Sequence, residues 1–352
     1  MSLINCYRLV SILLTTIAVL GFATPKAQAS LLVASNATNS VLEYDEITGA
    51  FIKTFISSGS GGLKEPLDLT FGPDGNLYVV SRATDSILKY NGTTGEFINA
   101  FVQSGSGGLK NPIDLDFGSD GNLYVSNSGL NGGFGEPAPI NNSANNVLKY
   151  NGTTGEFINA FVPSGGGGLK IPTGMRFGKD GNLYVNSRDT NSVLVYDKTT
   201  GNLIKTIIPS NNGEVDVPTG LTFGEDGTLY VSSLNTHSVL KNDGTMGTFL
   251  NTFVFPGSGG LIAPIGLAFG KDGNLYISSL GSNSILKYDK TTSNFISVFV
   301  PSGINAPLAP TGLVFSPTSS SNQVPEPSSL LAILLLGTFG TIASIKRSQS
   351  ML

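Results

Sequence analysis

The chain has 352 residues, a formal net charge of −4, 12% charged residues and 45 glycines. An average protein has about 25% charged residues and about 7% glycine. The length fits either two domains or one large all-β domain. One histidine, one cysteine and no tryptophan argue against a Cys/His zinc site, a disulfide framework and a Ser-His-Asp triad. The negative charge argues against a nucleic-acid-binding protein, because such proteins need a basic surface.

The first 29 residues predict a secretory signal peptide that is removed from the mature chain. Arg8 precedes an apolar run from Leu9 to Ala23, and this order is typical of export signals. Small residues then mark the expected cleavage site, at Ala27, Ala29 and Ser30. The alternative is a buried core helix over the apolar run, which is disfavoured because the strand-rich pattern that follows is complete without it.

Residues 30–316 contain one unit that occurs six times. Each unit has the same phrase, which ends at Phe71, Phe117, Phe177, Phe223, Phe269 or Phe315. Successive phenylalanines are 46 residues apart except for one interval of 60, which indicates a 14-residue insertion in one unit. A repeat of this length is typical of solenoids and propellers.

The first complete unit contains four strand-like segments, at 67–71, 76–80, 87–90 and 97–102. The first turn is Asp-Gly, a hairpin signal because both residues tolerate a positive φ. No segment has a long helical period, so we predict an all-β, six-bladed β-propeller with four antiparallel strands per blade. The turn aspartates could also form a calcium ladder, although turn chemistry is sufficient to explain them: Asp74, Asp120, Asp180, Asp226 and Asp272.

The two ends of the repeat region predict how the ring closes. Residues 31–66 supply the second, third and fourth strands of a blade, and Thr311–Phe315 supply a first strand alone. We therefore expect the C-terminal strand to pair with Leu31–Val33 and to complete the N-terminal blade. This pairing removes an open seam with unpaired strand edges.

The repeats resemble NHL repeats and the gluconolactonase-like and streptogramin-lyase-like propellers. Pro218–Phe223 followed by Asp226–Val231 carries the resemblance most clearly, and the similarity spans nearly all of 31–316. It implies the propeller fold rather than one function, because propellers host many unrelated functions.

The same resemblance implies two kinds of active site. Lactonase relatives use a channel-bound divalent metal held by Glu, Asn and Asp, and lyase relatives use a histidine as general base. Here the positions after the second strand are mostly serine, and the only histidine is His237, in a loop where other units have Asn or Asp. The full set of catalytic residues is therefore not visible, and an enzyme is the less favoured interpretation.

Function is expected on one face of the disc. The connections from fourth to first strand and from second to third strand emerge together there, and variable loops on a rigid scaffold commonly bind ligands. The 14-residue insertion, at about 129–142, belongs to this face. Three charged loop residues there could contact an acidic sugar or remain hydrated: Arg82, Arg188 and Asp189.

Two of the six units have an aspartate in the first strand at the position where the other four have glycine. Four units have glycine there, and two neighbouring units have Asp68 and Asp114. Because first strands line the central channel, both side chains should lie near its mouth. The pair could bind a hard cation such as calcium, with Asn127 or Asn186 completing the oxygen shell. The alternative is two solvated side chains that bond loop amides.

The C-terminal residues predict a membrane anchor. Residues 317–327 form a Ser/Pro linker and 328–345 an apolar segment, followed by basic residues. About 18 helical residues span about 27 Å, which nearly crosses a hydrocarbon core of about 30 Å. The basic end should remain cytoplasmic. We therefore predict a transmembrane helix and basic tail within 328–352, with the propeller on the outer side.

This order of features resembles the PEP-CTERM sorting signal of Gram-negative bacteria. The residues that carry the resemblance are Val324, Pro325, Glu326, Pro327, Lys346 and Arg347. It implies a membrane exosortase as processing partner, a transient inner-membrane anchor, and delivery to the cell surface, outer membrane or extracellular matrix. A permanent anchor without processing is the alternative.

Together these features predict a secreted, non-catalytic binding or scaffold module of the cell surface or matrix. The expected partner is extracellular polysaccharide or another surface protein, and no cofactor is expected apart from the calcium considered above. A metal-dependent, lactonase-like hydrolase with its site at the channel mouth is the alternative. A structural matrix filler without a ligand is a third interpretation.

Overall fold

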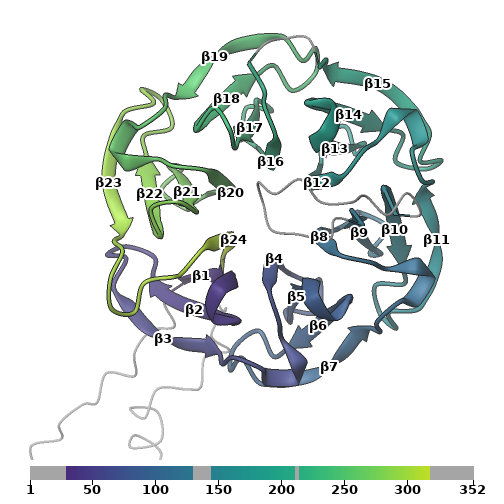
Figure 1. Ribbon diagram of the computed structural model, residues 1–352, viewed down its shortest axis with the longest axis horizontal. Coiled ribbons are helices and arrows are strands. Elements are labelled where there is room, and N and C mark those ends of the chain that lie inside the picture. The colour runs from purple at the N-terminus through teal and green to yellow at the C-terminus, as the bar shows by residue number, and fades with distance from the viewer. Residues whose placement is uncertain (1–28, 130–143, 211–213, 318–352) are drawn as a thin grey trace, which may run out of the picture. The chain divides into compact units, whose positions relative to one another are not determined.

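Six four-stranded antiparallel sheets form a closed ring in the computed structural model (Figure 1). The sheets are the blades of a propeller, as the repeats predict. Blades 1 to 5 are β4–β7, β8–β11, β12–β15, β16–β19 and β20–β23, and blade 6 combines β24 with β1, β2 and β3.

The strands keep the same order in every blade, from the channel to the rim. The innermost strands begin at proline and end at phenylalanine: β4 (Pro66–Phe71), β8 (Pro112–Phe117), β12 (Pro172–Phe177), β16 (Pro218–Phe223), β20 (Pro264–Phe269) and β24 (Pro310–Phe315). The second strands are β1 (Ser30–Ser35), β5 (Leu77–Ser81), β9 (Leu123–Asn127), β13 (Leu183–Ser187), β17 (Leu229–Ser233) and β21 (Leu275–Ser279).

The outer half of each blade is equally regular. The third strands are β2 (Ser40–Asp45), β6 (Ser86–Tyr90), β10 (Asn146–Tyr150), β14 (Ser192–Tyr196), β18 (Ser238–Asn242) and β22 (Ser284–Tyr288). The outermost strands lie along the rim (Figure 1) and are β3 (Phe51–Ile56), β7 (Phe97–Val102), β11 (Phe157–Val162), β15 (Leu203–Ile208), β19 (Phe249–Val254) and β23 (Phe295–Val300). Short 3₁₀ turns connect strands at η1 (Asn36–Thr38), η2 (Ser60–Gly62), η3 (Arg82–Thr84), η4 (Ser106–Gly108), η5 (Gly166–Gly168), η6 (Arg188–Thr190) and η7 (Ser258–Gly260).

The structure describes residues 29–129, 144–210 and 214–317. Several predicted features therefore lie outside the described residues: the signal peptide up to Gln28 with Ala27, the greater part of the insertion, and the sorting residues Val324, Pro325, Glu326, Pro327, Lys346 and Arg347. Within the three described ranges, no helix has the length and apolar character that a bilayer crossing requires. The helix expected after Pro327 stays a prediction.

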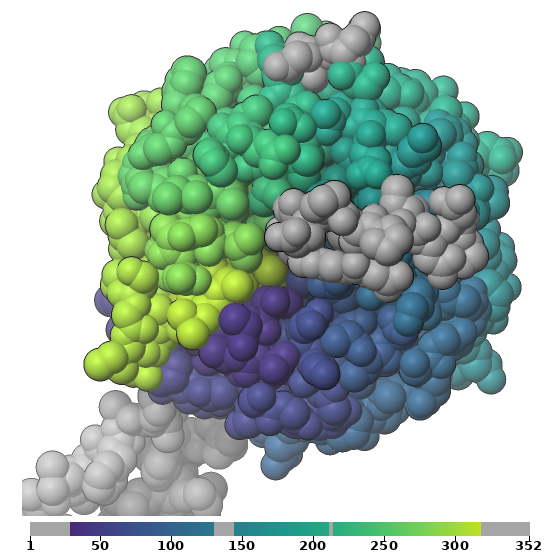
Figure 2. Space-filling view, viewed as in Figure 1, coloured from purple at the N-terminus to yellow at the C-terminus, as the bar shows by residue number. Residues whose placement is uncertain are grey.

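Ring closure by the two ends of the repeat region is confirmed. β24 pairs antiparallel with β1, with Leu31 opposite Phe315 and Val33 opposite Leu313. In the space-filling view, the first residues of the ring, in purple, lie beside the last, in yellow-green (Figure 2). The pairing leaves blade 6 with the same four strands as the other blades, so the ring has no seam that lacks a partner strand.

A repeated aromatic contact fills the space between blades. Tyr78 of β5 lies edge-to-face between Phe101 of its own blade and Phe117 of the next blade, with ring centroids 4.9 and 5.0 Å away. Tyr78 is 1% exposed. The same three-ring contact surrounds Tyr124, Tyr230 and Tyr276. The phenylalanine that marks the repeat in the sequence is therefore a partly buried inter-blade contact, packed against the core.

The loop face, where the connections from fourth to first and from second to third strands emerge, carries an inter-blade ladder. A side chain after the second strand accepts a hydrogen bond from a backbone N–H of the next blade, over 2.7 to 3.0 Å. The acceptors are Asn39, Asp85, Asn145, Asn191, His237 and Asn283; the donors are Glu65, Asn111, Ile171, Val217, Ala263 and Ala309. All twelve residues have φ between +45° and +57°.

The opposite face, called here the turn face, carries the repeated aspartates. The Asp74 carboxylate accepts hydrogen bonds from the Asn76 backbone N–H, the Asn76 amide and the Tyr78 hydroxyl, and it lies 2.7 Å from Lys89 Nζ. Burial alone would raise the pKa of Asp74, but these bonds lower it to about 2. The aspartate therefore closes a local turn, which supports the turn interpretation over a calcium ladder.

Candidate functional site

The third residue of each innermost strand borders the central channel, where neighbouring strands approach closely. A Cβ atom at Gly220 would clash with the Ile265 carbonyl oxygen of the next blade, and one at Gly266 with the Thr311 carbonyl oxygen. Glycine at this position therefore allows the innermost strands to pack together. Asp68 and Asp114 occupy the same position in blades 1 and 2.

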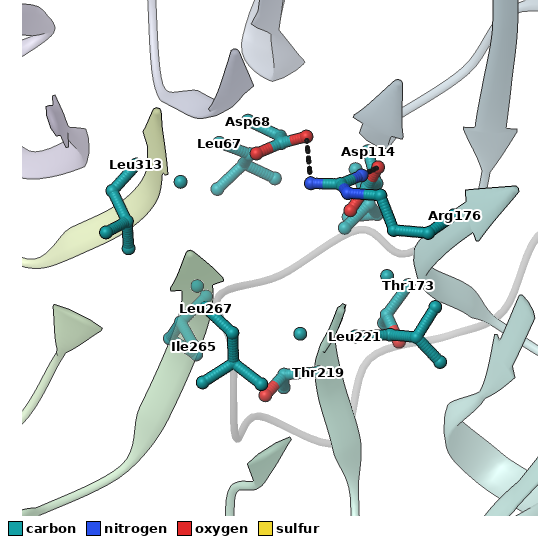
Figure 3. Close-up of a pocket in the computed structure, with 15 residues that line it drawn as sticks. Leu67, Asp68, Asp114, Thr173, Arg176, Thr219, Leu221, Ile265, Leu267 and Leu313 are labelled. Atoms are coloured by element: carbon teal, nitrogen blue, oxygen red, sulfur yellow. Dashed lines mark hydrogen bonds and ion pairs between the residues drawn. The ribbon is translucent and has the colours of Figure 1, made fainter. Parts of the chain in front are cut away.

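Arg176 brings the two aspartates together (Figure 3). Its Nη1 atom donates to Asp114 Oδ1 over 2.8 Å, and its Nη2 atom lies 3.6 Å from Asp68 Oδ2. Arg176 belongs to β12, so the cluster joins blades 1, 2 and 3. The two aspartates are 6% and 7% exposed, so they are buried rather than open at the channel mouth.

Asp116 adds a third carboxylate to the cluster. It lies two residues after Asp114 on β8, and residues two apart in a strand share a face. Its Oδ1 accepts from the Phe117 backbone N–H over 2.9 Å, and its Oδ2 accepts from the Phe177 N–H of blade 3 over 3.2 Å. The cluster therefore contains three carboxylates and one guanidinium.

Burial and mutual repulsion change the acidity of this cluster. Burial raises the pKa of Asp68, and the Arg176 charge opposes the rise. Burial raises the pKa of Asp114 well above its ordinary value; Arg176 opposes this change, and the charges of Asp68 and Asp116 add to it. Burial would lower the pKa of Arg176, but the three carboxylates raise it. The guanidinium therefore stays charged, and the aspartates bind a proton more readily than aspartates in water.

The cavity beside the cluster is small. Asp68, Asp114 and Arg176 border a volume of about 30 Å³ together with glycines and leucines of the other innermost strands. A water molecule needs about 10–15 Å³ of such volume, so roughly two waters fit. Ligand pockets commonly have volumes of about 300–1,000 Å³, so this volume is small for an organic substrate.

Asn127 and Asn186 both connect backbone segments. Asn127 Oδ1 accepts from the Lys110 N–H over 2.6 Å, where other blades use a serine. The Asn186 amide donates to the Thr219 carbonyl of the next blade over 2.9 Å, where Ser232 bonds the Ile265 carbonyl. No interaction joins either asparagine to Asp68 or Asp114 in the described part of the chain, and the expected completion of an oxygen shell is not seen.

The charged loop residues lie apart from the carboxylate cluster. Arg82 in η3 forms an ion pair with Glu65 over 3.2 Å. Arg188 in η6 is buried, whereas its neighbour Asp189 is exposed. These residues belong to blades 1 and 3 on the loop face. Their predicted contact with an acidic sugar stays a prediction.

His237 has a structural partner. Its Nδ1 atom accepts the Ala263 backbone N–H over 3.0 Å, as one of the six acceptors of the inter-blade ladder. The histidine thus replaces the asparagine or aspartate of the other blades. Among residues 29–129, 144–210 and 214–317, no group of three or more His, Cys, Asp or Glu side chains is arranged to hold a metal ion. The calcium prediction for Asp68 and Asp114 therefore gains no support.

Sequence reasoning missed Arg176 and Asp116. Both occupy the fifth position of an innermost strand, where the other blades have Thr70, Thr222, Ala268 and Val314. Arg176 is also the one basic residue in the six innermost strands. The third and fifth positions of a strand face the same side. Charged residues at these positions in blades 1, 2 and 3 could therefore have predicted the cluster from the sequence.

No protein-family model matches the sequence, and no curated protein matches it. Solved structures share the fold. The structure titled Nidogen/Laminin Complex has 17% sequence identity and a TM-score of 0.63, over 82% of this chain and 99% of that chain. Virginiamycin B lyase from Staphylococcus aureus has 13% identity and a TM-score of 0.53, over 84% and 93%. A streptogramin B lyase has 15% identity and a TM-score of 0.55, over 84% and 92%. At these identities the likenesses show a shared propeller fold alone.

Replacing Arg176 tests the electrostatic description of the channel. Arg176→Met leaves buried carboxylates without their counter-charge, which is expected to lower the free energy of unfolding by about 3–5 kcal/mol near pH 7. Raised aspartate pKa values mean that the folded chain binds protons more tightly than the unfolded chain, so stability is lost as pH rises through those values. The loss should therefore shrink toward pH ~4, where aspartates protonate.

Urea unfolding of the wild type, Arg176→Met and Arg176→Met/Asp114→Asn at the two pH values measures this effect. Asp114→Asn should restore part of the stability lost near neutral pH, because it removes one uncompensated charge. An equal loss at both pH values, with no restoration, would show that Arg176 acts through packing instead.

Proposed function

We propose that this chain is an exported, non-catalytic binding module whose partner docks on the loop face. The observation that carries the proposal is an asymmetry of the loops around a regular frame. The loops that enter blades 1, 2 and 3 end in exposed Lys64, Lys110 and Lys170. Lys110 also forms an ion pair with Asp85 over 2.7 Å. The loops that enter blades 5 and 6 expose Ile262 and Leu308 instead, at 45% and 44%.

The asymmetry suits a protein partner with adjoining acidic and apolar surfaces. Ile304, in the loop that leads to β24, is 97% exposed and extends the apolar side. Exposed apolar groups next to charges are typical of protein interaction sites. A propeller of the same fold occurs in a structure titled as a nidogen–laminin complex, which supports protein binding as a use of this architecture.

The hydrolase alternative has less support. Arg176 lies between the two carboxylates that would hold the metal. The adjoining cavity of about 30 Å³ is about one tenth of the smallest common ligand-pocket volume, about 300 Å³. A protein-binding function does not need a cavity in the channel. The exposed lysines and apolar side chains of the loop face would contact the partner directly.

Charge reversal on the loop face tests the binding proposal. The variant Lys64→Glu/Lys110→Glu/Lys170→Glu should weaken binding of the labelled full-length protein to host cells that lack their own copy by about ten-fold or more, because each like-charge contact opposes an acidic partner. Reversal of three lysines elsewhere on the disc is the matched control: Lys53→Glu/Lys198→Glu/Lys205→Glu.

Enzymatic treatment of the cells identifies the partner class in the same experiment. Loss of binding after surface proteolysis supports the protein partner, whereas loss only after polysaccharide digestion would replace it with a glycan. Equal weakening by the loop-face and control variants would contradict a loop-face site.

Export and sorting are the second part of the proposal. The support is the order of Pro325, Glu326, Pro327, an apolar segment and a basic end, together with the leader before Ser30. A processed chain should accumulate at the cell surface or in the matrix, after passing through a membrane-anchored form. The exosortase-type enzyme is the proposed processing partner.

Replacing the Pro-Glu-Pro motif tests the sorting route. In host cells, Pro325→Ala/Glu326→Ala/Pro327→Ala should leave the chain in the inner-membrane fraction at its unprocessed size, while the wild type reaches the surface fraction in a shorter form. Immunoblots of separated fractions measure both properties. A wild-type chain found in the cytoplasm would refute export, and an unchanged distribution of the variant would refute this motif.

A further inference from the structure

A repeated cluster on the turn face is closed in three blades. Blades 1, 2 and 5 each join a turn aspartate to a strand lysine over 2.7 to 2.8 Å, and a tyrosine hydroxyl donates to the same carboxylate over 3.0 to 3.1 Å. An asparagine amide holds the receiving oxygen over 2.9 Å. The clusters are Asp74–Tyr78–Lys89, Asp120–Tyr124–Lys149 and Asp272–Tyr276–Lys287.

Blade 4 has the same three residue types, but its cluster is open. Thr228 replaces the asparagine; its backbone N–H bonds Asp226 Oδ1 over 3.0 Å, and its side chain also hydrogen-bonds the Asp226 carboxylate. In the described ranges, no ion pair joins Lys241 to Asp226, and the Tyr230 hydroxyl has no hydrogen-bond partner. Tyr230 is nevertheless 3% exposed. Lys241 Nζ instead lies over the Tyr230 ring, 5.6 Å from its centroid. Burial would raise the pKa of Asp226, but its hydrogen bonds with Thr228 and the charge of Lys241 lower it, without a direct ion pair.

The open cluster borders a cavity between blades 4 and 5 of about 340 Å³. The corresponding seam between blades 5 and 6, with its closed cluster, has about 170 Å³. Lys271 and Glu46 form an ion pair across that smaller seam over 3.5 Å. At the equivalent positions of the larger seam the charges are reversed, as Glu225 and Lys290, and no ion pair joins them among the described residues.

The groups around the larger cavity define the chemistry of a ligand. Lys241, Lys290 and the Tyr230 hydroxyl can donate, whereas Asp226 and Glu225 can accept. The two positive and two negative charges cancel, which disfavours a net anion. Hydroxyl groups both donate and accept, so adjacent hydroxyls can bridge the separated carboxylate and ammonium groups of Asp226 and Lys241.

Size and apolar surface fit the same ligand class. Tyr230 and Phe269 border the cavity with their rings, 5.2 Å apart between centroids. Ligand pockets commonly have volumes of about 300–1,000 Å³ and combine apolar walls with a few polar groups. We propose that the seam between blades 4 and 5 binds a neutral, hydroxyl-rich ring, such as one hexose unit of a polysaccharide. This site lies on the turn face and is separate from the proposed protein site on the loop face.

Titration of the full-length protein with methyl α-D-glucopyranoside, methyl α-D-galactopyranoside and methyl α-D-mannopyranoside tests the site, with sodium glucuronate as the anionic comparison. Saturation-transfer NMR detects binding. Lys241→Met removes a charged donor and should weaken binding about ten-fold or more, and Tyr230→Phe should weaken it about five-fold. The matched controls in a closed cluster are Lys89→Met and Tyr78→Phe, which should leave binding unchanged.

Thermal unfolding verifies that the variants are folded and adds a second readout. Tyr230→Phe should leave the melting temperature unchanged, because its hydroxyl has no partner, whereas Tyr78→Phe should lower it. Several outcomes would overturn the proposal: no binding of any neutral glycoside, binding of glucuronate alone, binding that survives both blade 4 variants, or equal weakening by the controls. A negative result in the loop-face binding experiment would not affect this test. The lysines reversed in that experiment lie on the loop face, whereas this cavity lies on the turn face.

Discussion

In every blade a side chain held in a left-handed turn accepts a backbone N–H from the next blade, and that donor is itself left-handed. Left-handed backbone costs about 1–2 kcal/mol per L-residue, and the donors include the β-branched Ile171 and Val217. Such conformations persist only where surrounding contacts enforce them. The closed ring therefore holds these residues in their left-handed conformations. The hydrogen bonds of the ladder in turn fix the loops between neighbouring blades. His237 shows that geometry is what matters, because a ring nitrogen replaces the usual amide oxygen.

The fixed frame decides where chemistry can occur. Close approach of the innermost strands leaves little space in the channel, so Asp68, Asp114 and Arg176 neutralise one another around a volume of about 30 Å³. Two departures from the repeat distinguish some blades from others. On the loop face, exposed lysines in some loops are replaced by exposed apolar residues in others. On the turn face, a cavity borders the blade 4 cluster, in which Thr228 replaces the asparagine. The proposed functions lie at these departures. A module that holds a protein on one face and a sugar on the other would suit a cell-surface matrix.

The fold could be predicted from the sequence because it repeats. The phenylalanine spacing, the Asp-Gly turns and the incomplete terminal units together define six blades and their closure, since each signal is local and is confirmed by its copies.

The channel cluster was half predicted: Asp68 and Asp114 were found, but Arg176 reaches them across blades, 62 residues from Asp114 along the chain. Asn127 and Asn186 were assigned to a cation shell. The sequence does not show that each replaces a serine of other blades and, like that serine, forms a hydrogen bond with the backbone. The open cluster of blade 4 was hidden, because Asp226, Tyr230 and Lys241 match the residues of closed blades.

Hydrogen exchange at the six donor amides of the ladder tests most directly whether the ring is one cooperative frame. Amides that open only with global unfolding share one free energy of exchange, whereas a separately opening segment exchanges faster. In a single cooperative ring the six donor amides should exchange equally slowly: Glu65, Asn111, Ile171, Val217, Ala263 and Ala309. Faster exchange confined to Glu65 and Ala309, the two donors that flank blade 6, would show that the blade built from both ends opens independently. That result would contradict the closed frame on which both proposed sites depend.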